Sequence, residues 1–448
     1  MENTFINKKE ENALQDVRKK TPTVVSVVEI LLKSFVVFLF LFEFNCSVFG
    51  LPTFVTTRRV AVGIMFLHVL LCSSLKRTPR TTSATYYKKI ILLQALMLAY
   101  AAILLIVIGR GSGEHVFNRI ATFFLVGIFG AYIISRYFSS LEELMKTLLI
   151  ACLVQAFFIV LFALVPTIGD RVDRFIGLYE GNASLNRRGY LTGFACSAAP
   201  GMLCMVPGFA ACIYFILKRP NKEFFFVALF SVLVFAATMI ARTGLVIGLI
   251  GLFLIWLGGG KTKKGRGIKI LLMFLGIFLF GFTFIVVFGL GDKITSLFNR
   301  VVDLLREGLW GDFFAAYFGQ VAGSKTVIPP ISLETIVGTG ILSGTSANGV
   351  TVNVDGGFVR VYTALGLPMA IISYLSLFGN SIQAARKLSD PVFKYTMIFM
   401  VAYLFVGEFK EFFLYNGLAI ATFFGMLLLY DKDSIKKERE RKLLNAEI

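Results

Sequence analysis

Histidine and cysteine are scarce in this chain, and their scarcity argues against two kinds of site. The 448 residues include only two histidines, His68 and His115, which are too few for a histidine-ligated metal centre. The six cysteines lie in or beside apolar segments and form no C-x-x-C pair. We therefore expect them to be small buried apolar residues, with neither a disulfide framework nor a metal site.

Long polar stretches are also few. Hydrophobic residues make up 56% of the chain, the mean hydropathy is +0.77, and apolar runs recur along its whole length. This composition predicts an all-α polytopic integral membrane protein without a large domain outside the bilayer. The net charge of +18 could suggest a nucleic-acid partner. However, the lysines and arginines stand in short loops between apolar runs, which indicates membrane orientation and no nucleic acid.

Hydropathy predicts about twelve transmembrane helices, since a span needs roughly 17–25 apolar residues. The first apolar run begins too late, and is too long, for a cleaved signal peptide, so it should remain as an anchor. Glu29 and Lys33 in this run stand four residues apart and are expected to pair. Pro200 and Pro207 should kink the sixth helix. The twelve ranges are 23–45, 54–75, 88–109, 117–135, 144–166, 190–217, 224–241, 243–257, 268–289, 358–380, 395–407 and 414–430.

Basic loops predict the orientation. With twelve spans, the basic stretches at 76–89, 218–222, 261–269, 386–394 and the tail KKERERK all fall on the side of the N-terminus. The positive-inside rule makes that side cytoplasmic for both termini. Arg58 and Arg59 violate the rule. The predicted parts are a cytoplasmic tail 1–22, helices 1–5 in 23–166, a first outer loop 167–189, helices 6–9 in 190–289, a large outer loop 290–357, helices 10–12 in 358–430 and a cytoplasmic tail 431–448.

The large outer loop contains three distinct pieces of sequence. SLFNRVVDLLREGL at 296–309 looks like an amphipathic helix, and VIPP after it breaks any helix. The Gly/Ser/Asn-rich stretch GTGILSGTSANG follows it.

Arginines gather on the predicted outer face, against the positive-inside rule. A guanidinium is always charged and forks onto two oxygens, so it suits phosphate or pyrophosphate. For most of them we favour an ordinary alternative, solvated loop charges paired with nearby acids. Arg242 is the exception, because it is the only charge in the apolar run 224–257 and a charge in the bilayer is costly. The arginines are Arg171, Arg174, Arg187, Arg188, Arg242, Arg300, Arg306 and Arg360.

An acceptor hydroxyl on this face would need a base to take its proton, and a carboxylate can fill that role. The candidates near apolar helix ends are Asp355, Glu180, Glu408 and Glu411. Asp355 stands at the start of the tenth helix, five residues before Arg360. It is either a helix N-cap or a catalytic or substrate-binding acid.

Three stretches of the chain resemble the bacterial O-antigen polymerase and O-antigen ligase superfamily of membrane glycosyltransferases. RFIGLYEGNAS at 174–184 is similar to the family's R-x-x-G…N segment, and it includes Asn182. ARTGLVIGL at 241–249 is similar to the S-R-x-G turn between two helices. TIVGTGILSG followed by VDGGFVRVYTALGLP, within 335–368, looks like the end of the large outer loop. The resemblance covers roughly residues 140–430.

The resemblance implies a reaction and its partners. The donor is a glycan on undecaprenyl pyrophosphate, the acceptor in a polymerase is a second lipid-linked repeat unit, and transfer needs no metal or other cofactor. By position, Arg174 and Arg242 correspond to the family's lipid-pyrophosphate arginines, and Arg300, Arg360 and Asn182 are further candidates for substrate binding. The candidate catalytic residues are Arg242 and Asp355, and Asp355 is the candidate base. A membrane-bound chain-length regulator is a further candidate partner, and the expected location is the bacterial inner membrane with the active site on its periplasmic face.

Two alternatives stay open. The first is an O-antigen ligase that transfers the glycan to the lipid A-core. Ligases of the family carry a histidine in the large outer loop, and this chain has none after His115. The second is a flippase or transporter of lipid-linked oligosaccharides, a class that often shows two related halves. No such halves are visible here, and the unusual charges collect on one face, which favours a one-sided polymerase.

Overall fold

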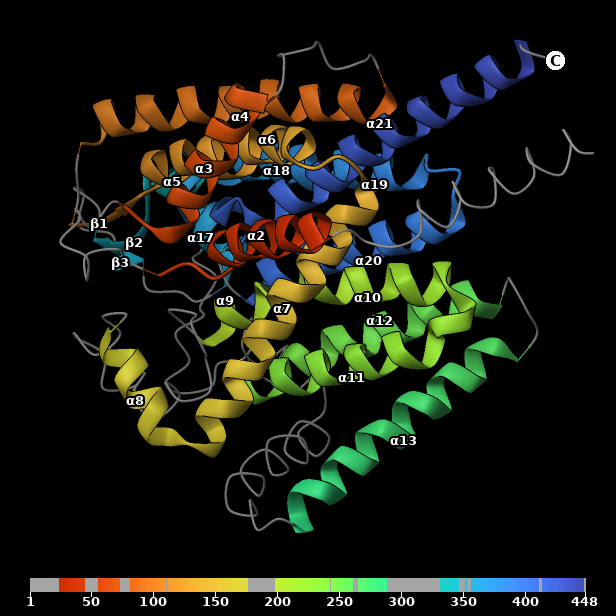
Figure 1. The fold of residues 1–448 in the computed structure, drawn as a ribbon. Helices are drawn as coiled ribbons and strands as arrows, with labels where there is room; N and C mark the ends of the chain where they lie inside the picture. Colours follow the sequence, from red (N-terminus) through yellow and green to blue (C-terminus); the bar gives the residue numbers. More distant parts are fainter. Residues whose placement is uncertain are drawn as a thin grey trace, which may run out of the picture.

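The protein is built mainly of α-helices, with one small sheet (Figure 1). The computed structural model describes residues 24–44, 55–72, 81–109, 112–175, 198–241, 243–260, 265–287, 331–345, 351–352, 356–410 and 413–446. The helices are α2 (Val24–Leu41), α3 (Thr57–Cys72), α4 (Thr82–Val107), α5 (Val116–Phe123), α6 (Gly130–Tyr137), α7 (Leu141–Leu164), α8 (Pro166–Phe175), α9 (Ala198–Leu203), α10 (Val206–Lys218), α11 (Glu223–Ile240), α12 (Thr243–Gly260), α13 (Arg266–Val287), α16 (Leu333–Val337), α17 (Gly357–Leu365), α18 (Leu367–Tyr374), α19 (Asn380–Arg386), α20 (Pro391–Lys410) and α21 (Leu418–Ala446). Between them lie the π-helical segments η2 (Phe124–Phe129) and η5 (Leu375–Gly379), the 3₁₀ turns η4 (Pro220–Lys222) and η6 (Leu414–Asn416), and the strands β1 (Ser112–His115), β2 (Ile341–Thr345) and β3 (Thr351–Val352).

The predicted apolar ranges coincide with helices, and the membrane character of the chain follows from their length and composition. Each of the twelve ranges overlaps one helix or a run of consecutive helices. Among the described residues, six helical stretches are long and apolar enough to cross a membrane: Ser83–Val107, Val116–Tyr137, Leu141–Phe162, Gly201–Lys218, Pro220–Ile240 and Pro391–Phe409. The total of twelve spans stays a prediction.

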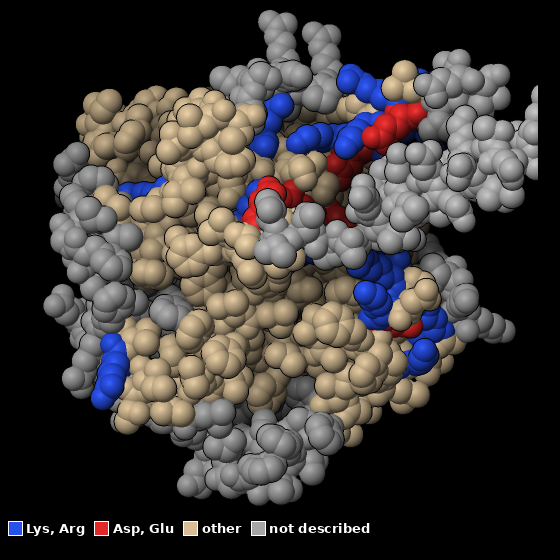
Figure 2. Space-filling model, viewed as in Figure 1, with Lys and Arg blue, Asp and Glu red and all other residues tan. Residues whose placement is uncertain are grey.

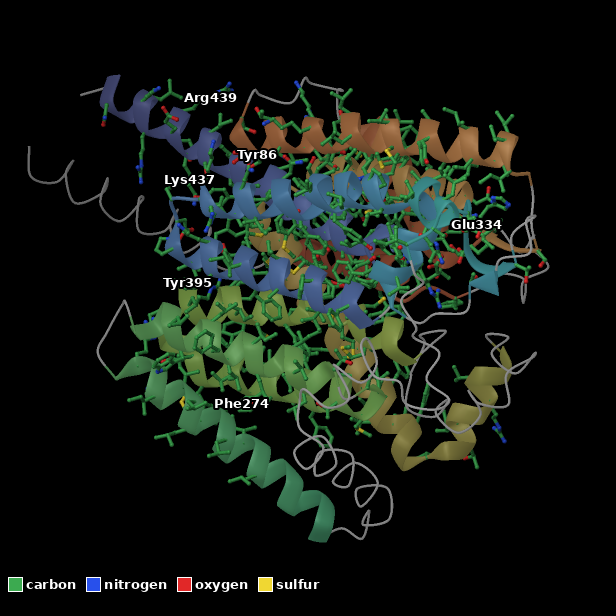
Figure 3. All side chains as sticks on the ribbon, turned by 180° about the vertical axis from the view of Figure 1, so that it is seen from behind. Tyr86, Phe274, Glu334, Tyr395, Lys437 and Arg439 are labelled. Carbon is green, nitrogen blue, oxygen red and sulfur yellow. The ribbon has the colours of Figure 1, made fainter. Side chains whose placement is uncertain are left out.

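The helices run between two ends of the molecule. At one end, which we call the sheet end, lie β1–β3 and the turn η6. At the other, the basic end, hydrogen bonds and ion pairs join the first turns of α4 and α7 to α21 and to the α10–α11 turn. Figure 2 shows most Lys and Arg of this face toward the basic end, with Asp and Glu among them, whereas the rest of the described face is largely tan. Tyr86 and Tyr395 lie at the basic end and Glu334 at the sheet end (Figure 3).

Burial divides the helices into a centre and a periphery. The stretch Gly201–Lys218, which contains α10, is 94% buried, and α10 contacts α7, α11, α12 and α20. By contrast, the stretch Ser83–Val107 of α4 is only 28% buried. An apolar helix with so little cover suits a lipid environment, because in water its exposed apolar surface would be unfavourable.

Close backbone approach at the sheet end fixes α21 against η2. Gly417 has φ +83°, and a Cβ placed there would lie 2.7 Å from the backbone nitrogen of Gly127. Only glycine fits such a conformation at such a distance. α21 then continues along α6, where Gly425 leaves room for the side chain of Ile134.

The expected pairing of Glu29 with Lys33 is confirmed, and the expected interruption of the sixth range is confirmed beside Pro207 only, since Pro200 stands within α9. Lys33 Nζ lies 2.6 Å from Glu29 Oε1, and it also lies 2.6 Å from Glu143 Oε1 on α7. The sixth range is broken between α9 and α10 at Cys204–Met205, and Pro207 stands in the first turn of α10. Proline suits that position because its missing N–H would have no partner there.

The described parts of the predicted outer loops contain secondary structure. The Gly/Ser/Asn-rich stretch GTGILSGTSANG contains strand β2, which pairs with β1 and β3, so one small sheet accompanies the helices. The partner strand β1 is distant in sequence, which is why local pattern did not reveal it. The range of the first outer loop begins with helix α8. The predicted amphipathic helix at 296–309 lies outside the described residues.

Candidate functional site at the sheet end

The sheet ties the loop after α4 to the segment that precedes α17. Ser112 to His115 pair antiparallel with Thr345 to Ile341, with an irregularity between Glu114 and His115. The N–H of Val116 also donates to the carbonyl of Gly340 at 3.0 Å. Residues more than two hundred positions apart are thereby held at one end of the helices.

Two glycines hold the start of the sheet against the far end of α17. Gly338 and Gly366 have φ of +102° and +77°, and a Cβ on Gly366 would lie 2.2 Å from the carbonyl oxygen of Ile336. Thr339 N–H donates to Thr363 O at 2.9 Å, and Gly340 N–H donates to Ala364 O at 3.0 Å. These contacts satisfy the last carbonyls of α17 and so fix the helix that carries Arg360.

A fully buried carboxylate stands near the sheet end of α20. Glu408 Oε2 accepts the backbone N–H groups of Phe413 and Leu414 at 2.9 and 2.8 Å, and Oε1 accepts the hydroxyl of Tyr374 at 2.7 Å. A buried carboxylate is costly unless its oxygens are hydrogen-bonded. Glu408 therefore fixes the turn at η6 and joins α20 to α18.

Arg360 supplies a positive charge to this carboxylate. It lies in the first turn of α17, is half-buried, and interacts electrostatically with Glu408. Around them stands a cluster of rings centred on Phe358, whose centroid lies 4.8 Å from that of Tyr374 and 5.8 Å from that of Phe405. Phe405 is 50% exposed, so the ring cluster reaches the outer surface of the bundle near Glu408.

A buried cation, Arg58, joins the end of α2 to the end of α9 and to η6. Its Nε donates to Phe40 O at 2.9 Å, one Nη donates to Leu41 O at 3.2 Å and Cys204 Sγ at 3.9 Å, and the other meets Asn416 Oδ1 and lies 2.6 Å from Glu43 Oε2. A guanidinium has five N–H donors, and these contacts account for all five. Arg58 therefore caps the carbonyls at the end of α2 and leaves no donor for a ligand.

Helix α9 links α20 to the two helices on either side of position 242. The hydroxyl of Tyr403 on α20 donates to Leu203 O at the end of α9 at 2.8 Å. α9 in turn contacts α11 and α12. Ala241, which ends α11 in an extended conformation, and Thr243, which begins α12, therefore stand at the sheet end on the two sides of position 242.

The structure places few of the predicted site residues. Arg360 lies beside Glu408, as described above. Arg174 falls in α8, with only its backbone described. Arg242, Asp355, Arg300 and Asn182 lie outside the described residues, so their grouping stays a prediction.

Sequence reasoning missed the roles of Arg58 and Glu43. Arg58 counted only as a violation of the positive-inside rule, although Glu43, fifteen residues earlier, provided a possible counter-charge at the end of the preceding helix. Glu408 was considered as an acid but was not paired with Arg360.

Within the described ranges, no group of three or more His, Cys, Asp or Glu side chains is arranged to hold a metal ion. Comparisons with protein-family models, curated proteins and solved structures found no match for this chain.

Proposed function

We propose that this protein polymerises lipid-linked polysaccharide repeat units of the O-antigen type. The anomeric carbon of the donor glycan leaves the pyrophosphate oxygen of undecaprenyl pyrophosphate and bonds to a hydroxyl oxygen of the acceptor repeat unit. The acceptor hydroxyl loses its proton to a base, and undecaprenyl pyrophosphate departs. The proposal rests on the resemblance of the three sequence stretches quoted above.

The proposal includes a topology of twelve spans with both termini in the cytoplasm. The sheet end then faces the periplasm, and the protein lies in the bacterial inner membrane. The observation that supports this arrangement is the pairing of β1 with β2, since the two segments belong to loops that the twelve-span pattern assigns to the same side. Charges that accumulate at the opposite end fit the positive-inside rule.

In this proposal the pyrophosphate is bound at the sheet end by Arg242, Arg174 and Arg360, with Arg300 and Asn182 as further contacts. Fixed positive charge stabilises the charge that develops on a leaving pyrophosphate. The observation that carries the proposal is convergence: α17, which bears Arg360, and the helix ends on either side of position 242 both lie at the sheet end.

The acceptor base is assigned to Asp355. Glu408 is less suitable in this role, because it is fully buried and its two oxygens already accept three hydrogen bonds. We instead give Glu408 a positioning role, in which it holds η6 and faces Arg360.

The test is the lipopolysaccharide ladder of cells that carry variants of the full-length chain. Arg242→Ala should leave a folded, membrane-inserted protein and cells whose lipopolysaccharide carries single repeat units only. The matched control is Lys269→Ala at the basic end, whose side chain is 68% exposed and which should leave a normal ladder.

Other ladders would point to other functions. A normal ladder with Arg242→Ala would refute the pyrophosphate role. Loss of every repeat unit, single units included, would indicate a ligase. A flippase would add nothing in sealed vesicles supplied with substrate that is already on the periplasmic side, whereas a polymerase would elongate it.

A further inference from the structure

Two lysines from different helices meet at one aromatic ring at the basic end. Lys89 Nζ of α4 lies 5.5 Å from the ring centroid of Tyr86, and Lys387 Nζ, just beyond α19, lies 5.3 Å from the same centroid. The ring itself is buried, with 5% of Tyr86 exposed, while both lysines are exposed. The two ammonium groups are thus no farther apart than the sum of these distances. With their exposed neighbours Lys88 and Arg386 they form what we call the Tyr86 patch.

The Tyr86 patch differs from the other cation groups at the basic end. Three other groups of cations at the basic end include a glutamate. Glu142 pairs with Lys218 and Arg219, Glu143 pairs with Lys33, and Glu223 pairs with Arg266. Among the residues that the structure describes, no carboxylate forms an ion pair with Lys88, Lys89, Arg386 or Lys387.

Asp431 is held at the first turn of α4, and Asp390 stands three residues after Lys387, but neither forms an ion pair with the patch. Asp431 accepts the N–H of Ser83 at 3.3 Å, and Asp390 accepts the N–H of Val392 at 2.9 Å. Like charges held together repel one another. The patch therefore presents four positive charges that an anion from outside the chain would stabilise.

Apolar surface adjoins the patch along both helices. On α4, Leu92 and Leu96 are 73% and 51% exposed, one and two turns beyond Lys88. On the neighbouring helix run, Leu375 and Ile382 are 65% and 39% exposed. α4 contacts both η5 and α19, so the two apolar faces belong to adjacent elements. A ligand that fits both features has an anionic group at the basic end and hydrocarbon beside α4.

We propose that the Tyr86 patch binds the phosphate headgroup of an anionic phospholipid, whose acyl chains lie along α4 and the η5–α19 segment. Basic pockets between transmembrane helices are suited to anionic headgroups, and lysine stems can lie on apolar surface while the ammonium reaches the interface. A buried aromatic ring beneath two ammonium groups holds them in place by cation–π attraction. The site is independent of the proposed polymerase activity and lies at the opposite end of the molecule.

The test uses the full-length protein in phosphatidylcholine nanodiscs with increasing fractions of phosphatidylglycerol. Native mass spectrometry counts the phosphatidylglycerol retained by the released protein. The variant Lys89→Gln/Lys387→Gln should lose at least tenfold of the preference for phosphatidylglycerol over phosphatidylcholine. The matched control, Lys269→Gln/Lys436→Gln, removes the same charge from exposed lysines that each lie 4.0 Å from a glutamate, and it should keep the preference.

Three results would overturn the proposal. One is a wild-type protein without preference for phosphatidylglycerol, a measurement that needs no variant to fold. Another is a patch variant that keeps the wild-type preference, or a control variant that loses it equally. The third comes from inorganic phosphate: if it displaces phosphatidylglycerol and raises the unfolding temperature as much as the lipid does, the ligand is a free anion and not a lipid.

Discussion

Arg58 at the sheet end and Lys218 at the basic end are both paired with a glutamate, yet their surroundings are opposite. The Arg58 side chain is 4% exposed and also donates to helix-end carbonyls, an amide and a thiol. The Lys218 side chain is 38% exposed and shares Glu142 with Arg219 and Lys146. Arg58 is therefore packed inside the protein, whereas Lys218 is accessible to water and to dissolved ions.

This contrast between Arg58 and Lys218 indicates which charged side chains the stability of the fold depends on. A buried ion pair is not by itself evidence of net stability, but removal of one partner leaves an uncompensated buried charge. Exposed ion pairs are screened and contribute little. Removal of Arg58 should therefore damage the fold far more than removal of Lys218 or of its partner Glu142.

The largest effect is expected from Arg58→Ala. The change removes a cation from Glu43 and a donor from Asn416, and it leaves the carbonyls of Phe40 and Leu41 without the side chain that caps them. A buried polar group left unsatisfied costs about 1–3 kcal/mol, so we expect a loss of about 3 kcal/mol or more. The free energy of unfolding in detergent, followed by circular dichroism, measures the loss. Arg58→Met/Glu43→Gln, which removes both charges, should recover part of it. Equal loss in the single and double variants would show that the carbonyl caps, and not the charge pair, carry the effect.

Glu408→Ala should have the next largest effect. It removes the acceptor of two buried N–H groups, those of Phe413 and Leu414, and each unsatisfied group costs about 1–3 kcal/mol. Glu408→Gln keeps an oxygen for these donors and places its amide near the Tyr374 hydroxyl, so most of the stability should remain. Thermal unfolding of the two variants side by side checks this. If glutamine is as harmful as alanine, the negative charge opposite Arg360 matters more than the hydrogen bonds.

Glycine substitutions compare the packing of the two ends without a change of charge. Gly417→Ala at the sheet end introduces a Cβ 2.7 Å from Gly127 N at a positive φ, and we expect a loss of about 1–3 kcal/mol. Gly259→Ala near the basic end meets its nearest atom at 3.6 Å, an ordinary contact, in a helix where alanine is favoured over glycine. The unfolding temperature should fall for Gly417→Ala and stay or rise for Gly259→Ala. A similar fall in both would mean that the space around Gly259 does not accept a methyl group.

Helix positions were predictable from sequence because apolar runs of bilayer length are a local signal. The sheet was not, since β1 is four residues long, includes Gly113, and depends on a partner more than two hundred residues later. The π-helical segment η2 is likewise a product of packing. Tyr87 donates to the carbonyl of Ile128 within it, and this pairing joins separate helices.

The sequence indicated single residues of the candidate site, but it did not indicate which of them lie close together. Arg360 and Glu408 each stood out as a charge near an apolar helix end, but they are 48 positions apart and only the packing of α17 on α20 pairs them. Arg58 appeared to break the positive-inside rule, which counts charges in loops. The rule does not apply to a cation whose charge is neutralised by Glu43 and whose donors are all taken within the fold.

Glu142→Gln should have the smallest effect. Glu142 receives Lys146, Lys218 and Arg219, but all four side chains are 28–42% exposed, so we expect a loss of at most about 1 kcal/mol. Because these charges are screened, the difference in unfolding temperature between wild type and Glu142→Gln should shrink as NaCl rises from 0.05 to roughly 1 M, where the Debye length falls to about 3 Å. The Arg58→Ala difference should change less over the same range, because the Arg58 side chain is only 4% exposed and it also donates to the carbonyls of Phe40 and Leu41. If both differences respond to salt alike, water reaches Arg58 and the contrast between the two ends is wrong.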